Sequence, residues 1–243
     1  MAKKFYVVWA GRKTGIFTEW PTTKRSVEKF PGARYKSFPT MAEAEAAFGG
    51  GGRTAINPKG SVKKAVKGPV SNAEIQIYCD GGCEPNPGNA GSGVAVYRSG
   101  KLEELWYGLY NPMGTNNTAE LNALHQALLI AERELSKGVS IEILSDSSYS
   151  IKCIKEWAPG WQRRGWTRPA GEIKNLDLIK PIFELYTRIK AGIALNHVKA
   201  HVGIEGNELA DRMSIITLSE KERAFVRFPD TSDIEGLLKL RAG

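Results

Sequence analysis

The sequence has few cysteines, no paired cysteine motif and no long apolar run. Its three cysteines, Cys79, Cys83 and Cys153, form no C-x-x-C pair. This argues against a disulfide framework or a zinc site and fits a reducing cytosol, so a cytoplasmic protein is expected. The apolar part of the opening MAKKFYVVWAGRK is too short for a secretory signal. No stretch reaches the length of a membrane span, and none is expected.

Acidic residues are scarce in the first third of the chain. Residues 1–72 hold 14 Lys and Arg against 4 Asp and Glu, whereas residues 73–243 hold 20 against 22. The net charge of +8 therefore originates entirely in the first third. Clustered Lys and Arg bind phosphate backbones by releasing condensed counterions, so a polyanion is the expected partner of this part. A basic surface that is merely solvated is the alternative.

Composition divides the chain into four segments. Residues 3–48 predict a small α/β domain, with strands at 5–9, 16–17 and 34–38 and helices at 22–29 and 40–48. Residues 49–72 begin with four glycines and contain five basic and no acidic residues, which indicates a flexible basic linker. Residues 73–218 predict a larger domain. Residues 219–243 hold enough apolar side chains to dock on the larger domain or on a partner, and the sequence does not distinguish between these two alternatives.

Strands precede helices in the larger domain. An antiparallel meander is predicted at 74–79, 91–97 and 102–109, followed by strands at 141–144 and 194–198. Helical spacing covers 117–135, 147–156, 176–189 and 205–218. The order βββαβαβα predicts an α/β fold with one mixed five-stranded sheet. In such a sheet a site is expected at the carboxyl ends of the strands.

Four carboxylates follow apolar strands or lie on helices beside polar residues. They are Asp80 in IQIYCDGG, Glu120 in TNNTAELNAL, Asp146 in IEILSDSSY and Asp211 in HVGIEGNELAD. Carboxylates brought together repel and raise each other's pKa unless a cation meets them. Ligand sets made only of oxygen suit Mg²⁺ or Mn²⁺, and a pair of such ions is widely used to cleave phosphodiesters. The sequence therefore predicts a divalent-metal site.

The order and spacing of these motifs resemble type 1 ribonuclease H over about residues 74–218. The matching runs are DGGC from Asp80, TNNTAE to Glu120, SDS around Asp146 and HVGIEGNELAD to Asp211. The resemblance implies a ribonuclease H-like fold and an endoribonuclease that hydrolyses the RNA strand of RNA·DNA hybrids, leaving 3′-hydroxyl and 5′-phosphate ends. It also implies two Mg²⁺ ions, with Mn²⁺ as a substitute.

Within this resemblance, each carboxylate has an expected role. Asp80 would lie between the two ions, Asp211 would hold the ion that prepares the attacking water, and Glu120 with Asp146 would hold the ion at the leaving oxygen. His201 resembles the family's mobile histidine and would shuttle a proton or help release product. A surface histidine without a role is the alternative for His201.

The resemblance also assigns substrate contacts around the metal site. Contacts with the 2′-hydroxyl groups of RNA are implied for Asn86, Asn116, Asn117 and the backbone near Cys83. The paired asparagines could instead serve only as a helix cap. A second group resembles the surface that follows the DNA strand: Thr115 and Asn175 at a phosphate pocket, and Tyr149 and Trp157 along a channel.

The run from Trp157 to Arg168 interleaves tryptophan and arginine with turn residues and resembles the basic protrusion of the family. For Trp161 and Trp166 the alternative is simple anchoring of the protrusion to the core. Pro169 stands where some family members carry a small hydroxyl residue, a departure from the pattern.

The N-terminal segment resembles the hybrid-binding domain that precedes many type 1 ribonucleases H. The resemblance rests on FYVVWAGRKTGIF and FPGARYKSF, and it implies DNA-strand contacts by Tyr6, Trp20, Tyr35 and Lys36. Ser37 replaces a second lysine that is common there. RNA·DNA hybrid is the expected partner of a monomeric protein, and double-stranded RNA is a second candidate ligand for this segment.

Two rival functions fit parts of the sequence. A protein that only masks double-stranded nucleic acid is disfavoured, because a binder gains nothing from four carboxylates that repel phosphates. A transposase-like nuclease of the same fold that acts on DNA is disfavoured by the TNN block and by the hybrid-binding segment.

Overall fold

The computed structural model describes residues 4–28, 30, 34–49, 72–200 and 202–243. They divide into two compact units, Met1–Val62 and Lys63–Gly243. The expected linker falls largely within residues 50–71, which lie outside the described residues, as does His201. Across the described ranges, no helix combines the length and apolar character that a membrane crossing needs.

The N-terminal unit is a small antiparallel sheet with two helices. Its strands β1 (Phe5–Ala10), β2 (Gly15–Phe17) and β3 (Arg34–Phe38) are ordered β2-β1-β3, and the helices are α1 (Trp20–Val27) and α2 (Met41–Gly49). Helix α1 begins before the predicted residue 22, because proline is compatible with the first turn, where its missing N–H costs no helical hydrogen bond. Among the side chains of this unit that the structure describes, the buried apolar ones are few: Val7, Val8, Val27 and Ala44.

The larger unit is built on one mixed sheet of six strands in the order β8-β7-β4-β5-β6-β9. Strands β4 (Ile75–Glu84), β5 (Gly88–Arg98) and β6 (Lys101–Gly114) form the predicted meander. Strands β7 (Ile141–Ser145) and β8 (Ile193–His197) add on in parallel. The α/β class is confirmed, and β9 (Phe225–Arg227) adds a sixth strand to the five expected, by pairing with β6.

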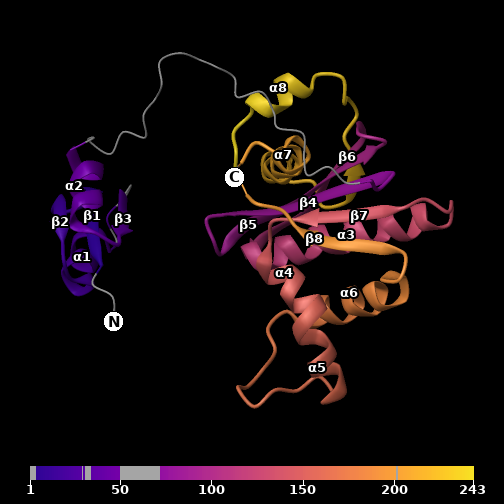
Figure 1. Ribbon diagram of the computed structural model, residues 1–243, viewed down its shortest axis with the longest axis horizontal. Helices are drawn as coiled ribbons and strands as arrows, with labels where there is room; N and C mark the ends of the chain where they lie inside the picture. Colours follow the sequence, from indigo (N-terminus) through magenta and orange to yellow (C-terminus); the bar gives the residue numbers. More distant parts are fainter. Residues whose placement is uncertain (1–3, 29, 31–33, 50–71, 201) are drawn as a thin grey trace. The chain divides into compact units, whose positions relative to one another are not determined.

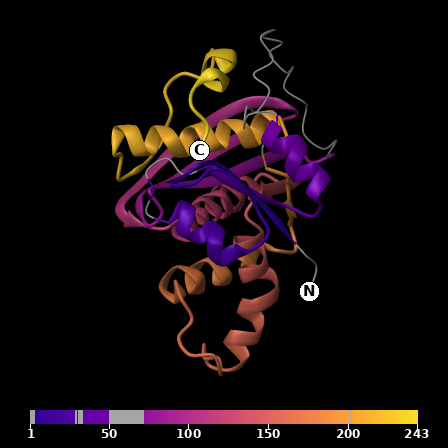
Figure 2. The ribbon, with the colours of Figure 1, turned by 90° about the vertical axis from the view of Figure 1, so that its left-hand side faces the viewer.

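Helices cover both faces of this sheet, as Figures 1 and 2 show. Helices α3 (Asn116–Leu135) and α6 (Leu176–Ile189) lie on one face, and α7 (Glu205–Glu220) lies on the other. The alternation along β4 explains this, since Ile75 and Ile77 join the cluster that contains α3, whereas Tyr78 joins the cluster that contains α7. Both faces of the central strands are therefore buried.

A longer helical run than expected follows β7. Helix α4 (Ser148–Lys152) leads through a π-helical turn, η1 (Cys153–Trp157), into α5 (Ala158–Arg163). The prediction ended the helix at residue 156, because Pro159 and Gly160 resemble a turn signal. Pro159 instead lies in the first turn of α5, where it needs no hydrogen-bond partner. Helix α5 projects away from the sheet in Figure 1.

The C-terminal segment, residues 225–243, docks on the body of its own chain. The ring of Phe225 stacks on Trp106 of β6 with centroids 5.7 Å apart. Helix α8 (Ile234–Lys239) inserts the buried Leu237 into the cluster on the α7 side of the sheet. The alternative that the sequence left open is thus decided in favour of docking within the chain.

A buried acidic residue ties helix α3 to strand β5. The carboxylate of Glu134 is 2.7 Å from Arg98 and also accepts hydrogen bonds from Arg133 and Lys137. Burial by itself would raise the pKa of Glu134, but the hydrogen bonds from Lys137, Arg98 and Arg133 outweigh it and lower the pKa to about 2. Because the folded pKa lies below the unfolded one, the charged carboxylate stabilises the fold.

Replacement of Glu134→Gln is expected to lower the free energy of unfolding by about 1–3 kcal/mol at neutral pH. This loss should be full above about pH 4.5 and should vanish as the pH falls towards about 2, because Glu134 then becomes protonated. Urea unfolding at several pH values measures it. The control is Glu132→Gln, which removes the same charge from the more exposed pair with Arg188. Equal effects of the two replacements at neutral pH would contradict the assignment.

Candidate active site

Two of the four carboxylates are juxtaposed by the register of neighbouring strands. The parallel pairing of β4 with β7 ends at Cys79 opposite Ser145, so the next residues, Asp80 and Asp146, emerge side by side. The predicted end of this strand at residue 79 was wrong, because β4 continues to Glu84 in its antiparallel ladder with β5. The glycines after Asp80, which resemble a turn, belong to this ladder.

Glycine at position 81 lets helix α3 approach the strand closely. A Cβ atom built on Gly81 would lie 2.2 Å from the backbone nitrogen of Glu120 and 2.3 Å from the carbonyl carbon of Ala119. No side chain fits there without displacing helix backbone. The close contact brings Glu120, in the second turn of α3, up to Asp80.

Asp80, Glu120 and Asp146 converge into a carboxylate triad. Each offers an oxygen, and these three oxygens lie within 4.8 Å of one another. Asp80 and Glu120 are buried, and the Gly81 N–H donates to Asp80 Oδ1 at 2.8 Å. Burial, followed by the charges of Asp146 and Asp211, raises the pKa of Asp80 well above its usual range. Burial, followed by the charges of Asp80 and Asp146, does the same to the pKa of Glu120.

The triad fits a divalent cation. Glu120 Oε2 is buried and has no hydrogen-bond partner among the residues that the structure describes. A buried carboxylate oxygen without a donor is costly, and three charged carboxylates at this separation repel one another. A hard cation with oxygen ligands would relieve both costs, which makes Mg²⁺ or Mn²⁺ compatible with these side chains.

Asp211 lines the same pocket but lies outside the triad. The pocket has a volume of about 390 Å³ and is bordered by all four carboxylates. Asp211 is buried on α7, forms an ion pair with Arg212, and accepts hydrogen bonds from the Gly243 N–H at 3.0 and 3.2 Å. The fourth predicted ligand is therefore close to the others and already bonded to other groups.

Asn207 is a residue of this site that the sequence motifs did not single out by role. Its buried side chain donates from Nδ2 to Asp146 Oδ2 at 2.9 Å and holds that carboxylate from helix α7. The available signal was its spacing, since Asn207 precedes Asp211 by four residues and so shares its helix face. From β8, the His197 ring reaches the Asp146 carbonyl oxygen at 3.1 Å.

Of the residues predicted to recognise RNA, Asn86, Asn116 and Cys83 lie at or beside the carboxylate pocket, whereas Asn117 lines a second pocket. Asn116 and Cys83 line it, and Asn86 Oδ1 accepts the Asn116 backbone N–H at 3.2 Å. Thr115 caps helix α3, since its hydroxyl accepts the Thr118 N–H at 3.2 Å. The residue that caps the helix is thus Thr115 and neither asparagine, and Asn116, at the first helical position, lines the pocket.

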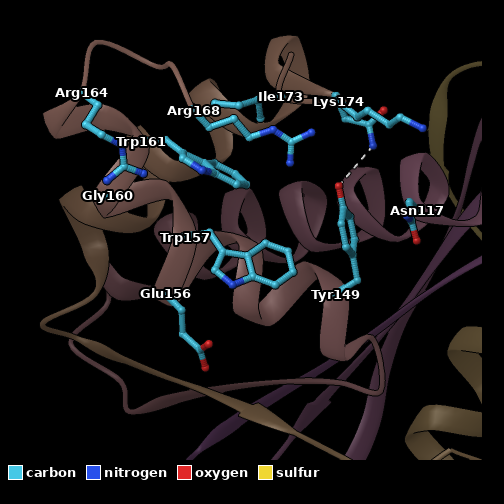
Figure 3. A pocket seen from close by; sticks show the side chains of 11 residues that line it. Asn117, Tyr149, Glu156, Trp157, Gly160, Trp161, Arg164, Arg168, Ile173 and Lys174 are labelled. Carbon is cyan, nitrogen blue, oxygen red and sulfur yellow. Dashed lines mark hydrogen bonds between the residues drawn. The ribbon is translucent and has the colours of Figure 1, made fainter. Parts of the chain in front are cut away.

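A second pocket, of about 550 Å³, lies between α3, the π-helical turn and the loop before α6 (Figure 3). It gathers the predicted residues Asn117, Tyr149, Trp157 and Asn175. Asn175 Nδ2 donates to the Tyr149 hydroxyl at 3.3 Å, and the rings of Tyr149 and Trp157 meet edge to face at 5.9 Å. Thr115 is not among its lining residues.

Cations around this second pocket add to the predicted set. Arg164, Arg168 and Lys174 line it together with Trp161. Lys174 belongs to none of the sequence motifs, although its position beside the predicted phosphate-binding residue Asn175 could have indicated it. Trp166 packs edge to face against Phe183 at 5.9 Å, which agrees with the anchoring alternative for this tryptophan.

In the N-terminal unit, three of the four predicted contact residues form one aromatic cluster. The Trp20 ring lies 5.5 Å from Tyr6 and 5.9 Å from Tyr35, and Trp20 and Tyr35 are 42% and 46% exposed. Lys36 lies instead over the Phe38 ring at 5.8 Å. Because neighbours along a strand point to opposite faces, Lys36 is on the other side of β3 from Tyr35.

Comparisons with known proteins agree with these features. The family model "RNase H" matches residues 72–216, and the model "Ribonuclease H1 N-terminal domain" matches residues 4–48. The Ribonuclease H of Pseudomonas aeruginosa (strain LESB58) is 36% identical over 151 residues, which cover 62% of this chain and 97% of that protein. The Ribonuclease H of Methylorubrum extorquens (strain PA1) is 36% identical over 146 residues, and the match spans 60% of either protein.

A solved structure is similar in fold. LC9-RNase H1, described as a type 1 RNase H, is 22% identical, with a TM-score of 0.53 over 71% of this chain and 83% of that one. At this identity the likeness concerns the fold alone. The first family model covers more than half of the chain, and the second covers the N-terminal unit. The chain therefore belongs to the ribonuclease H family, as a type 1 ribonuclease H that carries an N-terminal ribonuclease H1 domain.

Proposed function

We propose that the protein is an endoribonuclease that hydrolyses the RNA strand of RNA·DNA hybrids and leaves 3′-hydroxyl and 5′-phosphate ends. The observation that carries the proposal is the triad of Asp80, Glu120 and Asp146 in a pocket that Asn116 also lines. A site for divalent cations beside amide groups suits a substrate that combines phosphodiesters with ribose hydroxyls.

In this proposal, Asp80, Glu120, Asp146 and Asp211 hold two divalent cations, Mg²⁺ or Mn²⁺. Cations bound there would supply the positive charge that activates water and stabilises the leaving oxygen. Asn207 fixes the orientation of Asp146, and Gly81 keeps Glu120 close to Asp80. His201 is proposed to move a proton or to assist product release.

The two strands of the hybrid would be held by different surfaces. Asn86, Asn116 and the backbone at Cys83 are proposed to contact ribose hydroxyls, because an amide can both donate and accept hydrogen bonds. The second pocket is proposed to receive the DNA strand. Its cations suit a phosphate, and the exposed edge of Trp157 suits a deoxyribose, which lacks the 2′-hydroxyl.

The N-terminal unit is proposed to bind hybrid separately, at residues 3–48, with 49–72 as a linker to a catalytic domain at 73–218. The aromatic cluster of Tyr6, Trp20 and Tyr35 supports this, since exposed rings in a basic segment suit nucleic acid. Double-stranded RNA remains the second candidate ligand. We also propose that the protein is a monomer in the cytoplasm. Its three cysteines are unpaired, which is compatible with a reducing compartment.

The function is tested by incubating the full chain with labelled RNA·DNA hybrid, double-stranded RNA and double-stranded DNA, with and without Mg²⁺. We expect Mg²⁺-dependent cleavage of the hybrid RNA only, with ends that ligation identifies as 3′-hydroxyl and 5′-phosphate.

Asp146→Asn should reduce cleavage by at least about 10³-fold, because it removes charge at the transition state. The control Glu184→Gln removes one exposed charge from α6, at a residue that lines neither pocket. Normal turnover of Asp146→Asn at saturating Mg²⁺ would remove Asp146 from the site.

Recognition of consecutive ribose hydroxyls predicts that a single ribonucleotide embedded in DNA is cut poorly. Each amide left without a partner costs about 1–3 kcal/mol, so we expect at least a tenfold deficit relative to a run of ribonucleotides. Asn86→Asp retains the acceptor for the Asn116 N–H but loses the amide donor, whereas Asn86→Ala loses both. Efficient incision at the lone ribonucleotide would show that the asparagines do not read neighbouring sugars.

Deletion of residues 1–72 should leave cleavage chemistry intact but weaken hybrid binding and reduce the cuts made per encounter, because a tethered second site raises local concentration. Trp20→Ala with Tyr35→Ala should reproduce much of this loss. Met41→Ala is the matched control, since Met41 is 42% exposed in the same unit and lies outside the aromatic cluster.

Lys36→Ala tests separately whether the other face of β3 contributes to binding. Hybrid affinity is measured against salt concentration, and each lost phosphate contact should reduce the log–log slope by roughly 0.7–0.9. Superimposable curves and equal processivity for the full and truncated chains would leave the N-terminal unit without this role.

A further inference from the structure

The C-terminal segment, residues 225–243, ends inside the carboxylate pocket. After β9 and α8 the chain passes over α7, and its end lies near α7 and β4 in Figure 1. Arg241 and Gly243 line the same pocket as Asp80, Glu120 and Asp146. The docked elements before them, which include the buried Leu237, hold this end in place.

Two contacts join residues 241–243 to the site. The backbone N–H of Gly243 donates to both carboxylate oxygens of Asp211, at 3.0 and 3.2 Å. The guanidinium of Arg241 forms an ion pair with Glu84, which ends strand β4 at the rim of the pocket. A backbone donor of the C-terminal segment thus contacts Asp211, and a positive charge of the same segment pairs with Glu84 in the same pocket.

The approach at Gly243 is close. A Cβ atom at this position would lie 2.6 Å from Asp211 Oδ1, so only glycine fits without a shift of the chain or of the carboxylate. Arg212 links the same two parts, because it forms an ion pair with Asp211 and its Nη2 lies 3.4 Å from the Leu238 carbonyl oxygen. Asp211 is therefore held by its neighbour on α7 and by the C-terminal segment together.

These contacts compete with what the pocket is proposed to bind. The oxygens that accept the Gly243 N–H are those that Asp211 would offer to a cation, and Arg241 and Gly243 line the pocket that contains the triad. Resting on the proposed function, we infer that residues 241–243 are an internal competitor: they close the pocket over Asp211, and divalent cation and hybrid bind only when they are displaced.

The balance of contacts suits a reversible closure. Arg241 and Glu84 are 68% and 57% exposed, so their attraction is weak and is screened by salt. The stacked Phe225 and the buried Leu237 keep the rest of the segment docked when residues 241–243 leave. A closed state that held about 90% of the molecules would weaken the apparent affinity for a ligand of the open state about tenfold.

The test is direct titration of the full chain with Mn²⁺ alone, in the absence of nucleic acid, with free Mn²⁺ measured by electron paramagnetic resonance. Deletion of residues 241–243 is expected to lower the Kd for Mn²⁺ about tenfold. Gly243→Val should have a similar effect by steric displacement, and Arg241→Ala a smaller one. Lys239→Ala is the matched control, because it removes one positive charge from α8 outside the pocket.

Coupling to Asp211 separates competition from a general change in charge. In an Asp211→Asn background, the deletion should change Mn²⁺ affinity much less than in the native background, because the contested carboxylate is gone. Unchanged or weaker Mn²⁺ binding after deletion, or an equal gain in Lys239→Ala, would overturn the inference. Thermal unfolding of each variant shows whether the fold is retained.

The outcomes distinguish a failure of the internal competitor from a failure of the proposed function. If the full chain cleaves hybrid but the deletion leaves Mn²⁺ affinity unchanged, only the internal competitor is rejected. If the deletion tightens Mn²⁺ binding while no variant cleaves hybrid, the closure stands and the proposed nuclease activity falls.

Discussion

Repulsion among buried carboxylates is the constraint on which the site depends. Asp80, Glu120 and Asp146 are held with oxygens within 4.8 Å of one another, although burial and the neighbouring acidic charges raise the pKa of Asp80 and the pKa of Glu120 and so penalise the charged forms of these two residues. The surrounding fold imposes this geometry through strong, cooperative elements. The parallel ladder of β4 and β7 sets the two aspartates side by side, and Gly81 lets α3 deliver the glutamate. The sheet and helix α3 therefore position these three side chains before a cation binds, so the cation would meet ligands that are already arranged.

A comparison within the molecule shows how surroundings decide the state of a buried acid. Glu134 is buried like Asp80 and Glu120, yet its pKa is lowered to about 2 because Lys137, Arg98 and Arg133 contact it. Burial, followed by the charges of Asp146 and Asp211, instead raises the pKa of Asp80. The cations around Glu134 balance its charge and stabilise the fold, whereas the neighbours that act on Asp80 are themselves acidic. Gly243 supplies a hydrogen-bond donor to Asp211, and Arg241 supplies positive charge to Glu84 in the same pocket.

Much of the fold follows from local patterns. Helix α6 and strand β3 have the predicted bounds, because apolar spacing and β-branched or aromatic content mark them clearly. The errors arise where a local signal competes with a distant contact. The glycines after Asp80 resemble a turn but extend β4 through its pairing with β5, and Pro159 resembles a helix break but begins α5. Strand β9 is too short to be recognised without its partner β6.

The sequence by itself determined the order of the motifs, the four acids and the basic excess of the first third, because these are properties of residue type and spacing. Only the tertiary structure decided that three acids form a triad while Asp211 is bonded to Gly243, and that Trp20 lies between Tyr6 and Tyr35 in one aromatic cluster. Such facts depend on pairing register and on contacts between residues far apart in the chain. A contact of this kind leaves no periodicity in the sequence, since either partner could have met another surface.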